Sequence, residues 1–151
     1  MRLSTGVCRK SSVLPVIFML LFYPLQPSVA AAFGEARVEI AGKVIKVEVA
    51  ATEAQRIKGL SSRAETSKKY FMLFVFDTPQ QVIFWMKDTN RDLSIAFVDK
   101  KNIITQIVNL KARSLKTVES KSKQIKYALE VPKGYFATSK IRIGDKLVLI
   151  D

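Results

Sequence analysis

Apolar and charged positions alternate in the segment that follows residue 36. In residues 44–49, Val44, Val47 and Val49 are interspersed with Lys46 and Glu48, the pattern of a strand with one covered face. The shorter segment 37–40 precedes it as a second strand, and Ala41-Gly42-Lys43 lies between them as a turn. The pattern therefore predicts a β-hairpin.

A short helix is predicted over residues 53–58. Thr52 supplies a capping hydroxyl, and Gln55 three residues later can bond back to the Thr52 backbone, which is the arrangement of a capping box. Gly59 follows as a helix stop.

The rest of the chain reads mainly as strands. Residues 71–76 and 82–86 are continuous apolar runs separated by Asp77-Thr78-Pro79, and we predict both as central strands covered on two faces. Further strands are predicted at residues 93–98, 103–110, 127–131 and 146–150. One helical turn is predicted within residues 135–140. Many short strands and few helices indicate a mainly β fold, a compact antiparallel β-sandwich or barrel with one or two short helices.

The first 32 residues have the layout of a secretory signal peptide. Arg2, Arg9 and Lys10 precede the short apolar run 13–23, and small residues around Ala30 and Ala32 provide a cleavage site. A membrane span needs about 20 apolar residues, more than this run has, so we expect cleavage rather than anchoring. The sequence predicts export to the periplasm or outside the cell, with residues 33–151 as one domain and no transmembrane segment in the mature chain.

Removal of residues 1–32 would leave 22 basic and 13 acidic side chains, a net charge of +9. The mature chain would have neither histidine nor cysteine, because Cys8 leaves with the signal peptide. These absences exclude the usual zinc sites and His-dependent nucleophiles, and we expect no metal and no cofactor.

Basic residues concentrate in residues 111–126, which we predict to form a mobile, solvated loop. The segment contains one acidic residue, Glu119, and these basic residues: Lys111, Arg113, Lys116, Lys121, Lys123 and Lys126. Such a segment can contact an anionic envelope polymer or a membrane surface, or can simply keep the protein soluble. Because it contains nothing that reads bases, no specific nucleic-acid recognition is expected.

Several motifs resemble the DUF192 (UPF0127) family in order and spacing. They are Gly59-Leu60-Ser61-Ser62-Arg63, Met72-Leu73-Phe74-Val75-Phe76, Phe84-Trp85-Met86-Lys87-Asp88-Thr89, Leu93-Ser94-Ile95-Ala96-Phe97, Tyr127-Ala128-Leu129-Glu130 and Gly144-Asp145. The resemblance implies a compact β fold and no established activity. The chain departs from the family at Ser94, where the family has a carboxylate that Asp88 or Asp92 would have to replace.

Polar and amphipathic residues within these motifs form the candidate ligand-binding site: Arg63, Trp85, Lys87, Asp88 and Glu130. An aromatic face beside charged groups is a common way to hold a sugar or an anionic ligand. In the competing interpretation Trp85 belongs to the core, and Arg63 with Glu130 forms a structural ion pair. If Lys87 reaches solvent, strand alternation places Trp85 nearer the surface than Phe84 and Met86.

Two functions remain open from the sequence. The first is a non-catalytic binding module for a cell-envelope polymer, an anionic ligand or a partner protein. The second is a glycoside hydrolase or lyase that uses Asp88, Asp92 or Glu130 as acid and base. We assign no catalytic residue, since no motif contains a clear carboxylate pair.

Overall fold

The computed structural model describes residues 32–64 and 70–150. The predicted signal peptide, residues 1–32, lies outside this part of the chain except for Ala32. The elements in chain order are β1 (Gly34–Ile40), β2 (Lys43–Ala50), α1 (Glu53–Lys58), β3 (Met72–Gln80), β4 (Ile83–Phe84), β5 (Leu93–Asp99), β6 (Ile104–Leu110), β7 (Val118–Glu119), β8 (Ile125–Pro132), α2 (Tyr135–Thr138) and β9 (Leu147–Ile150). In these described residues no helix is long and apolar enough to cross a membrane.

Local sequence signals account for the first elements. β1 and β2 pair antiparallel around a turn in which Ala41 and Gly42 have φ of 50° and 72°, the left-handed values that tight hairpins need. The predicted capping box of α1 is present, with the Gln55 N–H donating to Thr52 Oγ1 at 3.2 Å and the Thr52 N–H donating to Gln55 Oε1 at 3.0 Å. The hairpin and the helix are therefore confirmed.

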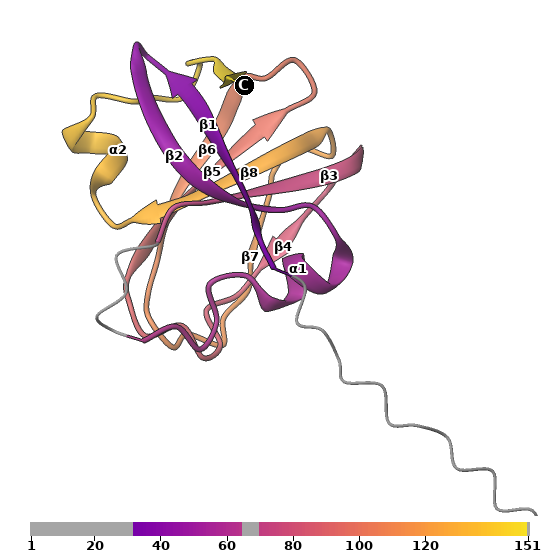
Figure 1. The fold of residues 1–151 in the computed structure, drawn as a ribbon, viewed down its shortest axis with the longest axis vertical. Helices are drawn as coiled ribbons and strands as arrows, with labels where there is room; N and C mark the ends of the chain where they lie inside the picture. Colours follow the sequence, from indigo (N-terminus) through magenta and orange to yellow (C-terminus); the bar gives the residue numbers. More distant parts are fainter. Residues whose placement is uncertain (1–31, 65–69, 151) are drawn as a thin grey trace, which may run out of the picture.

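Seven strands form one strongly curled sheet in the order β6-β5-β8-β3-β2-β1-β9 (Figure 1). The mainly β prediction is confirmed, with one difference in strand direction. β2 and β3 are parallel, while the other pairs in the sheet are antiparallel. A parallel pair needs a crossover connection, and α1 lies within it.

The two ends of the curled sheet approach each other. Ile103 and Lys146 form an isolated antiparallel bridge between the start of the β6 segment and the start of the β9 segment. The Leu147 N–H donates to Asn102 O at 2.8 Å, and the Ile104 N–H donates to Asp145 O at 2.9 Å. These bonds give the sheet the shape of a half-barrel.

The central strands are buried on both faces, as predicted for residues 71–76. In β3, Phe74 packs into one core cluster with Met72 and Phe97. Leu73 packs into the other cluster, with Leu129 of β8. The first cluster includes residues from the segments around α1 and β4. The second cluster is formed on the other face, with residues of β1, β2 and β9.

The prediction of a second doubly covered strand at residues 82–86 is wrong. Only Ile83 and Phe84 are in strand conformation, and β4 pairs with β7 in a separate two-stranded sheet. Ile83 is 63% exposed and Trp85 is 55% exposed, whereas Met86 is 2% exposed. The run is apolar throughout, so alternation between a covered and an open face cannot be seen in its residue types.

Candidate functional site

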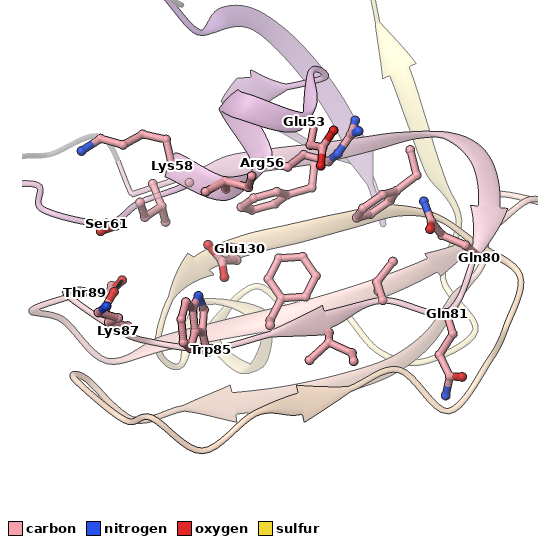
Figure 2. Close-up of a pocket in the computed structure, with 18 residues that line it drawn as sticks. Glu53, Arg56, Lys58, Ser61, Gln80, Gln81, Trp85, Lys87, Thr89 and Glu130 are labelled. Carbon is pink, nitrogen blue, oxygen red and sulfur yellow. Dashed lines mark hydrogen bonds between the residues drawn. The ribbon is translucent and has the colours of Figure 1, made fainter. Parts of the chain in front are cut away.

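A pocket of about 500 Å³ lies between α1 and the segment that carries β4 (Figure 2). Its walls combine aromatic and aliphatic side chains with polar side chains from both segments. The lining residues are Glu53, Arg56, Ile57, Lys58, Gly59, Leu60, Ser61, Phe74, Phe76, Gln80, Gln81, Val82, Ile83, Phe84, Trp85, Lys87, Thr89 and Glu130.

One wall is α1 and the turn that follows it. Gly59 ends the helix with φ of 45° and ψ of −136°, and its N–H donates to Gln55 O at 2.8 Å. A Cβ at this position would lie 3.3 Å from the ring carbon Cζ of Phe74. Glycine therefore lets the chain turn closely over the Phe74 ring and places Leu60 and Ser61 along the pocket.

The opposite wall is residues 82–89, which several backbone bonds hold in place. The Val82 N–H donates to Ser120 Oγ at 3.1 Å, and the Ser120 N–H donates back to Val82 O at 2.9 Å. The Met86 N–H donates to Ser114 O at 3.1 Å. The Ser62 N–H donates to Asp88 O at 2.7 Å, which joins the two walls at one end of the pocket.

The floor of the pocket carries a buried acid, Glu130. It lies in β8 between Met72 of β3 and Ile95 of β5, and both of these neighbours are fully buried. Glu130 is 4% exposed, and no residue described by the structure forms a hydrogen bond or ion pair with its carboxyl group. Figure 2 shows this carboxyl group between α1 and Trp85.

Burial raises the pKa of Glu130 to about 8, from an ordinary value of 4.5. Removal of the carboxylate from water disfavours its charged form, and the nearby positive charge of Arg63 offsets only part of that effect. At neutral pH the carboxyl group is mainly protonated, so it can donate a hydrogen bond as well as accept one.

Aromatic rings line the same pocket as the acid. Phe84 meets Phe74 edge to face, with ring centroids 4.9 Å apart, and contacts Phe97 at 5.9 Å. The Lys87 ammonium lies 5.6 Å from the Trp85 ring centroid. Trp85 is more than half exposed, so much of its indole remains open to a ligand.

The cations of the pocket differ in how free they are. The Arg56 guanidinium lies 5.5 Å from the Phe76 ring centroid and donates to Val75 O at 2.8 Å and also to Ala51 O, which fixes it to the scaffold. Lys58 and Lys87 are exposed at the mouth. An anionic group of a ligand would therefore meet these two lysines first.

The structure brings together three of the five predicted site residues. Trp85, Lys87 and Glu130 line the pocket. Trp85 is more exposed than Phe84 and Met86, as alternation predicted, and its assignment to the core is wrong.

The other two predicted residues, Arg63 and Asp88, do not line the pocket. Arg63 pairs with Glu48 at 2.5 Å rather than with Glu130, and both paired side chains are 15% exposed. Asp88 is exposed in a turn with φ of 56°, a left-handed value that Asp and Asn tolerate better than most residues. Its backbone carbonyl, which accepts from Ser62, is the group that shapes the site.

Neither Asp92 nor Ser94 contributes to the pocket. Asp92 binds Lys133 at 3.0 Å and accepts from the Ala112 N–H at 2.8 Å, and these contacts lower its pKa. Ser94 is buried and donates to Asn109 Oδ1 at 2.7 Å. It pairs with Val131, which belongs to the opposite core cluster, so position 94 faces away from Glu130.

The basic segment is more structured than predicted. It contains β7 and the first residues of β8, and Ser120 at its centre is buried and bonded to Val82 and Ser122. Arg113 donates to Asn90 Oδ1 at 2.9 Å, and Lys126 donates to Asp77 O at 3.0 Å. Arg113 is exposed, and so are four lysines of the segment: Lys111, Lys116, Lys121 and Lys123.

Sequence reasoning missed most of the pocket wall. Lys58 lies at the end of α1, and Gln80 and Gln81 lie where β3 leads into the β4 segment. Their participation depends on the packing of α1 against the sheet, and no local pattern reports it. The helix itself was predictable, because the signals at Thr52, Gln55 and Gly59 indicated a short helix over residues 53–58.

Comparison with known proteins gives one family. The DUF192 family model, described as "Uncharacterized ACR", matches residues 36–149. No curated protein matches the chain.

Two crystal structures share the fold. One is a protein from Sinorhizobium meliloti 1021, described as a candidate transcription regulator, with a TM-score of 0.70 and 26% identity over 79% of this chain and 96% of that chain. The other is a protein of unknown function from Novosphingobium aromaticivorans DSM 12444, with a TM-score of 0.67 and 25% identity over 82% of this chain and 89% of that chain.

Proposed function

The chain belongs to the DUF192 family, and we propose that this member is an exported, non-catalytic binding module whose pocket holds a saccharide of the cell envelope. The single observation that supports this proposal is that two side chains share one pocket: the buried carboxyl group of Glu130, which no described residue bonds, and the largely exposed Trp85.

Each part of the pocket suits a feature of a sugar. The indole of Trp85 provides a flat apolar surface for the C–H face of a pyranose ring. The protonated Glu130 offers both a donor and an acceptor to ring hydroxyl groups, and Gln80, Gln81 and Thr89 add further polar groups along the walls. A volume of about 500 Å³ falls within the range of small-ligand pockets.

The exposed lysines select among saccharides. Lys58 and Lys87 lie at the mouth, where they favour a sugar that carries a carboxylate or phosphate. A free anion alone is a poorer match, because the interior of the pocket is apolar and its deepest polar group is an acid. We therefore favour an acidic or phosphorylated envelope sugar over a small inorganic anion.

Export to the periplasm or the outside of the cell is part of the proposal and rests on the sequence of residues 1–32. Mass spectrometry of the protein recovered from the cell envelope would test it. We expect an N-terminus at Ala31 or Phe33, and intact Met1 would contradict processing.

The glycoside hydrolase alternative requires a second carboxylate about 5 to 10 Å from the first. Among the residues that line the pocket the other acid is Glu53, and Figure 2 shows it beside the Arg56 side chain, away from the Glu130 carboxyl. Asp88 and Asp92 lie outside the pocket. The raised pKa of Glu130 would suit a general acid, but the arrangement favours binding over hydrolysis.

A thermal-shift screen of the exported protein against neutral, acidic and phosphorylated envelope sugars tests the proposal. A ligand that binds only the folded state must raise the melting temperature. We expect a shift with an acidic sugar that Trp85→Ala and Glu130→Leu each abolish. Glu39→Gln, an exposed position in β1 outside the pocket, should leave the shift unchanged. If the sugars raise the melting temperatures of these variants and of the native protein equally, the pocket does not bind them.

A further inference from the structure

Large apolar side chains project into solvent around the mouth of the pocket. Ile57 is 76% exposed, Ile83 63% and Trp85 55%, and all three line the pocket. Leu115 is 70% exposed and follows Ser114, whose carbonyl accepts from the Met86 N–H next to Trp85. We call these four residues the apolar rim.

Such a cluster is unusual on a protein that remains free in water. The rim side chains come from three separate segments, 56–58, 83–87 and 111–117. The first two contribute to the pocket wall, and the third is bonded to the second through Ser114 O and the Met86 N–H. Their exposure is not a matter of poor packing, because Val82 and Met86, on the other face of the same segment, are buried.

A lysine accompanies the rim residue in each segment. Lys58 follows Ile57, Lys116 follows Leu115, and Lys87 lies two residues after Trp85. The three segments contain no acidic residue, although Glu53, Asp88 and Glu119 lie beside them in the sequence. Arg56 and Arg113 are bonded to the protein, which leaves exposed lysines as the available charges.

Apolar tips beside lysines match one partner chemistry. At the surface of an anionic bilayer, Trp, Leu and Ile side chains enter the boundary between headgroups and acyl chains, while lysines reach the phosphates. Each exposed cation near the surface strengthens the attraction to anionic lipid. From this pairing of apolar and basic side chains we infer that the apolar rim docks the mouth of the pocket on an anionic lipid bilayer.

This inference does not depend on the saccharide proposal, because docking is measured with lipid alone. It would place the pocket opening against the membrane surface, where a membrane-linked ligand could enter directly. Other occupants of the rim, such as a second copy of the chain, predict different results in the same experiment.

Trp85 is the one tryptophan of the whole chain, so it reports on the rim without labelling. The exported protein, with its N-terminus established by mass spectrometry, is titrated with vesicles of phosphatidylglycerol and phosphatidylethanolamine or of phosphatidylcholine. We expect a blue shift of Trp85 emission and protection from acrylamide with the anionic vesicles, weakened by high salt. With phosphatidylcholine vesicles we expect no shift at the same lipid concentration.

Two double variants separate the rim from general stickiness. Ile57→Ser with Leu115→Ser keeps Trp85 and is expected to lower vesicle partitioning by about tenfold or more, since two apolar side chains no longer enter the bilayer. Val44→Ser with Val148→Ser removes exposed apolar side chains on the β1–β2–β9 side and should leave partitioning unchanged.

Three results would overturn the inference. One is unchanged Trp85 emission with anionic vesicles. If the protein nevertheless sediments with the vesicles, it binds them through a surface other than the rim. Another is equal loss of partitioning in the two double variants. The third is a blue shift that appears without lipid as protein concentration rises, which would assign the rim to a contact between copies.

Discussion

Arg63 forms its ion pair with Glu48 at 2.5 Å and leaves Glu130 without a partner among the residues that the structure describes. Glu48 is in β2, opposite Met72 of β3, and Met72 is in turn opposite Glu130 of β8. The two acids therefore lie in the same row across the sheet, on the two strands that flank β3, and Arg63 is the guanidinium near both of them. Burial raises the pKa of Glu130 to about 8, and the positive charge of Arg63 offsets only part of that rise, so Glu130 is mainly protonated at neutral pH.

Replacement of either member of the Arg63–Glu48 ion pair should destabilise the protein. We expect Arg63→Met to lower the free energy of unfolding by about 3 kcal/mol, because it leaves the Glu48 carboxylate largely buried and uncompensated. Chemical denaturation monitored by Trp85 fluorescence measures this change. The double variant Arg63→Met with Glu48→Met should recover a large part of the loss, and a strictly additive loss would show that the pair is not coupled.

Glu130 should make the stability fall as pH rises. Between the unfolded pKa near 4.5 and the folded value of about 8, the folded state holds a proton that the unfolded state has released. Stability therefore decreases across that window, by an amount on the order of 5 kcal/mol at its upper end. Below pH 4.5 both states are protonated, and this effect disappears.

Glu130→Gln tests that linkage. We expect the variant to match the native protein near pH 4.5 and to become progressively more stable than it toward pH 8, as measured by urea unfolding at several pH values. Parallel stability curves for the two proteins would mean that Glu130 titrates normally.

Gly59→Ala should weaken the α1 wall. The added Cβ would lie 3.3 Å from Phe74 Cζ, and the backbone has φ of 45°. We expect a loss of about 2 to 3 kcal/mol. Gly42→Ala is the matched control, since Gly42 has φ of 72° but no atom within 4 Å of an added Cβ, and it should lose only about 1 kcal/mol. Equal losses would show that the contact with Phe74 costs nothing.

The lysines of the basic segment should differ in what they contribute, some to stability and others to electrostatic contacts. Lys126→Ser removes the bond to Asp77 O and should lower the unfolding free energy by about 0.5 to 1 kcal/mol. Lys121→Ser with Lys123→Ser should leave the melting temperature unchanged and reduce retention on an acidic polysaccharide column at low salt. Retention unaffected by the double variant would remove these two lysines from any electrostatic contact.

Features set by neighbours in the chain were predictable from the sequence. Thr52, Gln55 and Gly59 specify α1 through contacts within one turn, and the alternation in residues 44–49 specifies a strand. The continuous apolar run at 71–76 was equally clear. Both faces of β3 contact core residues, so both faces carry apolar side chains.

Features that depend on contacts between distant segments could not be predicted from the sequence. The partner of Arg63 depends on the registers of β2, β3 and β8, and the exposure of Trp85 depends on β4 leaving the main sheet to pair with β7. The pocket exists because a parallel β2–β3 pair carries α1 across the sheet, and nothing local to residues 43–50 distinguishes parallel from antiparallel pairing.

β9 has a particular role in assembly. It pairs with β1, and backbone bonds at its start also reach the segment that begins β6, so one short strand fastens together the earliest and the middle parts of the domain. A growing chain that has not yet made β9 leaves those two sheet margins unjoined. Completion of the sheet therefore waits until β9 has been synthesised.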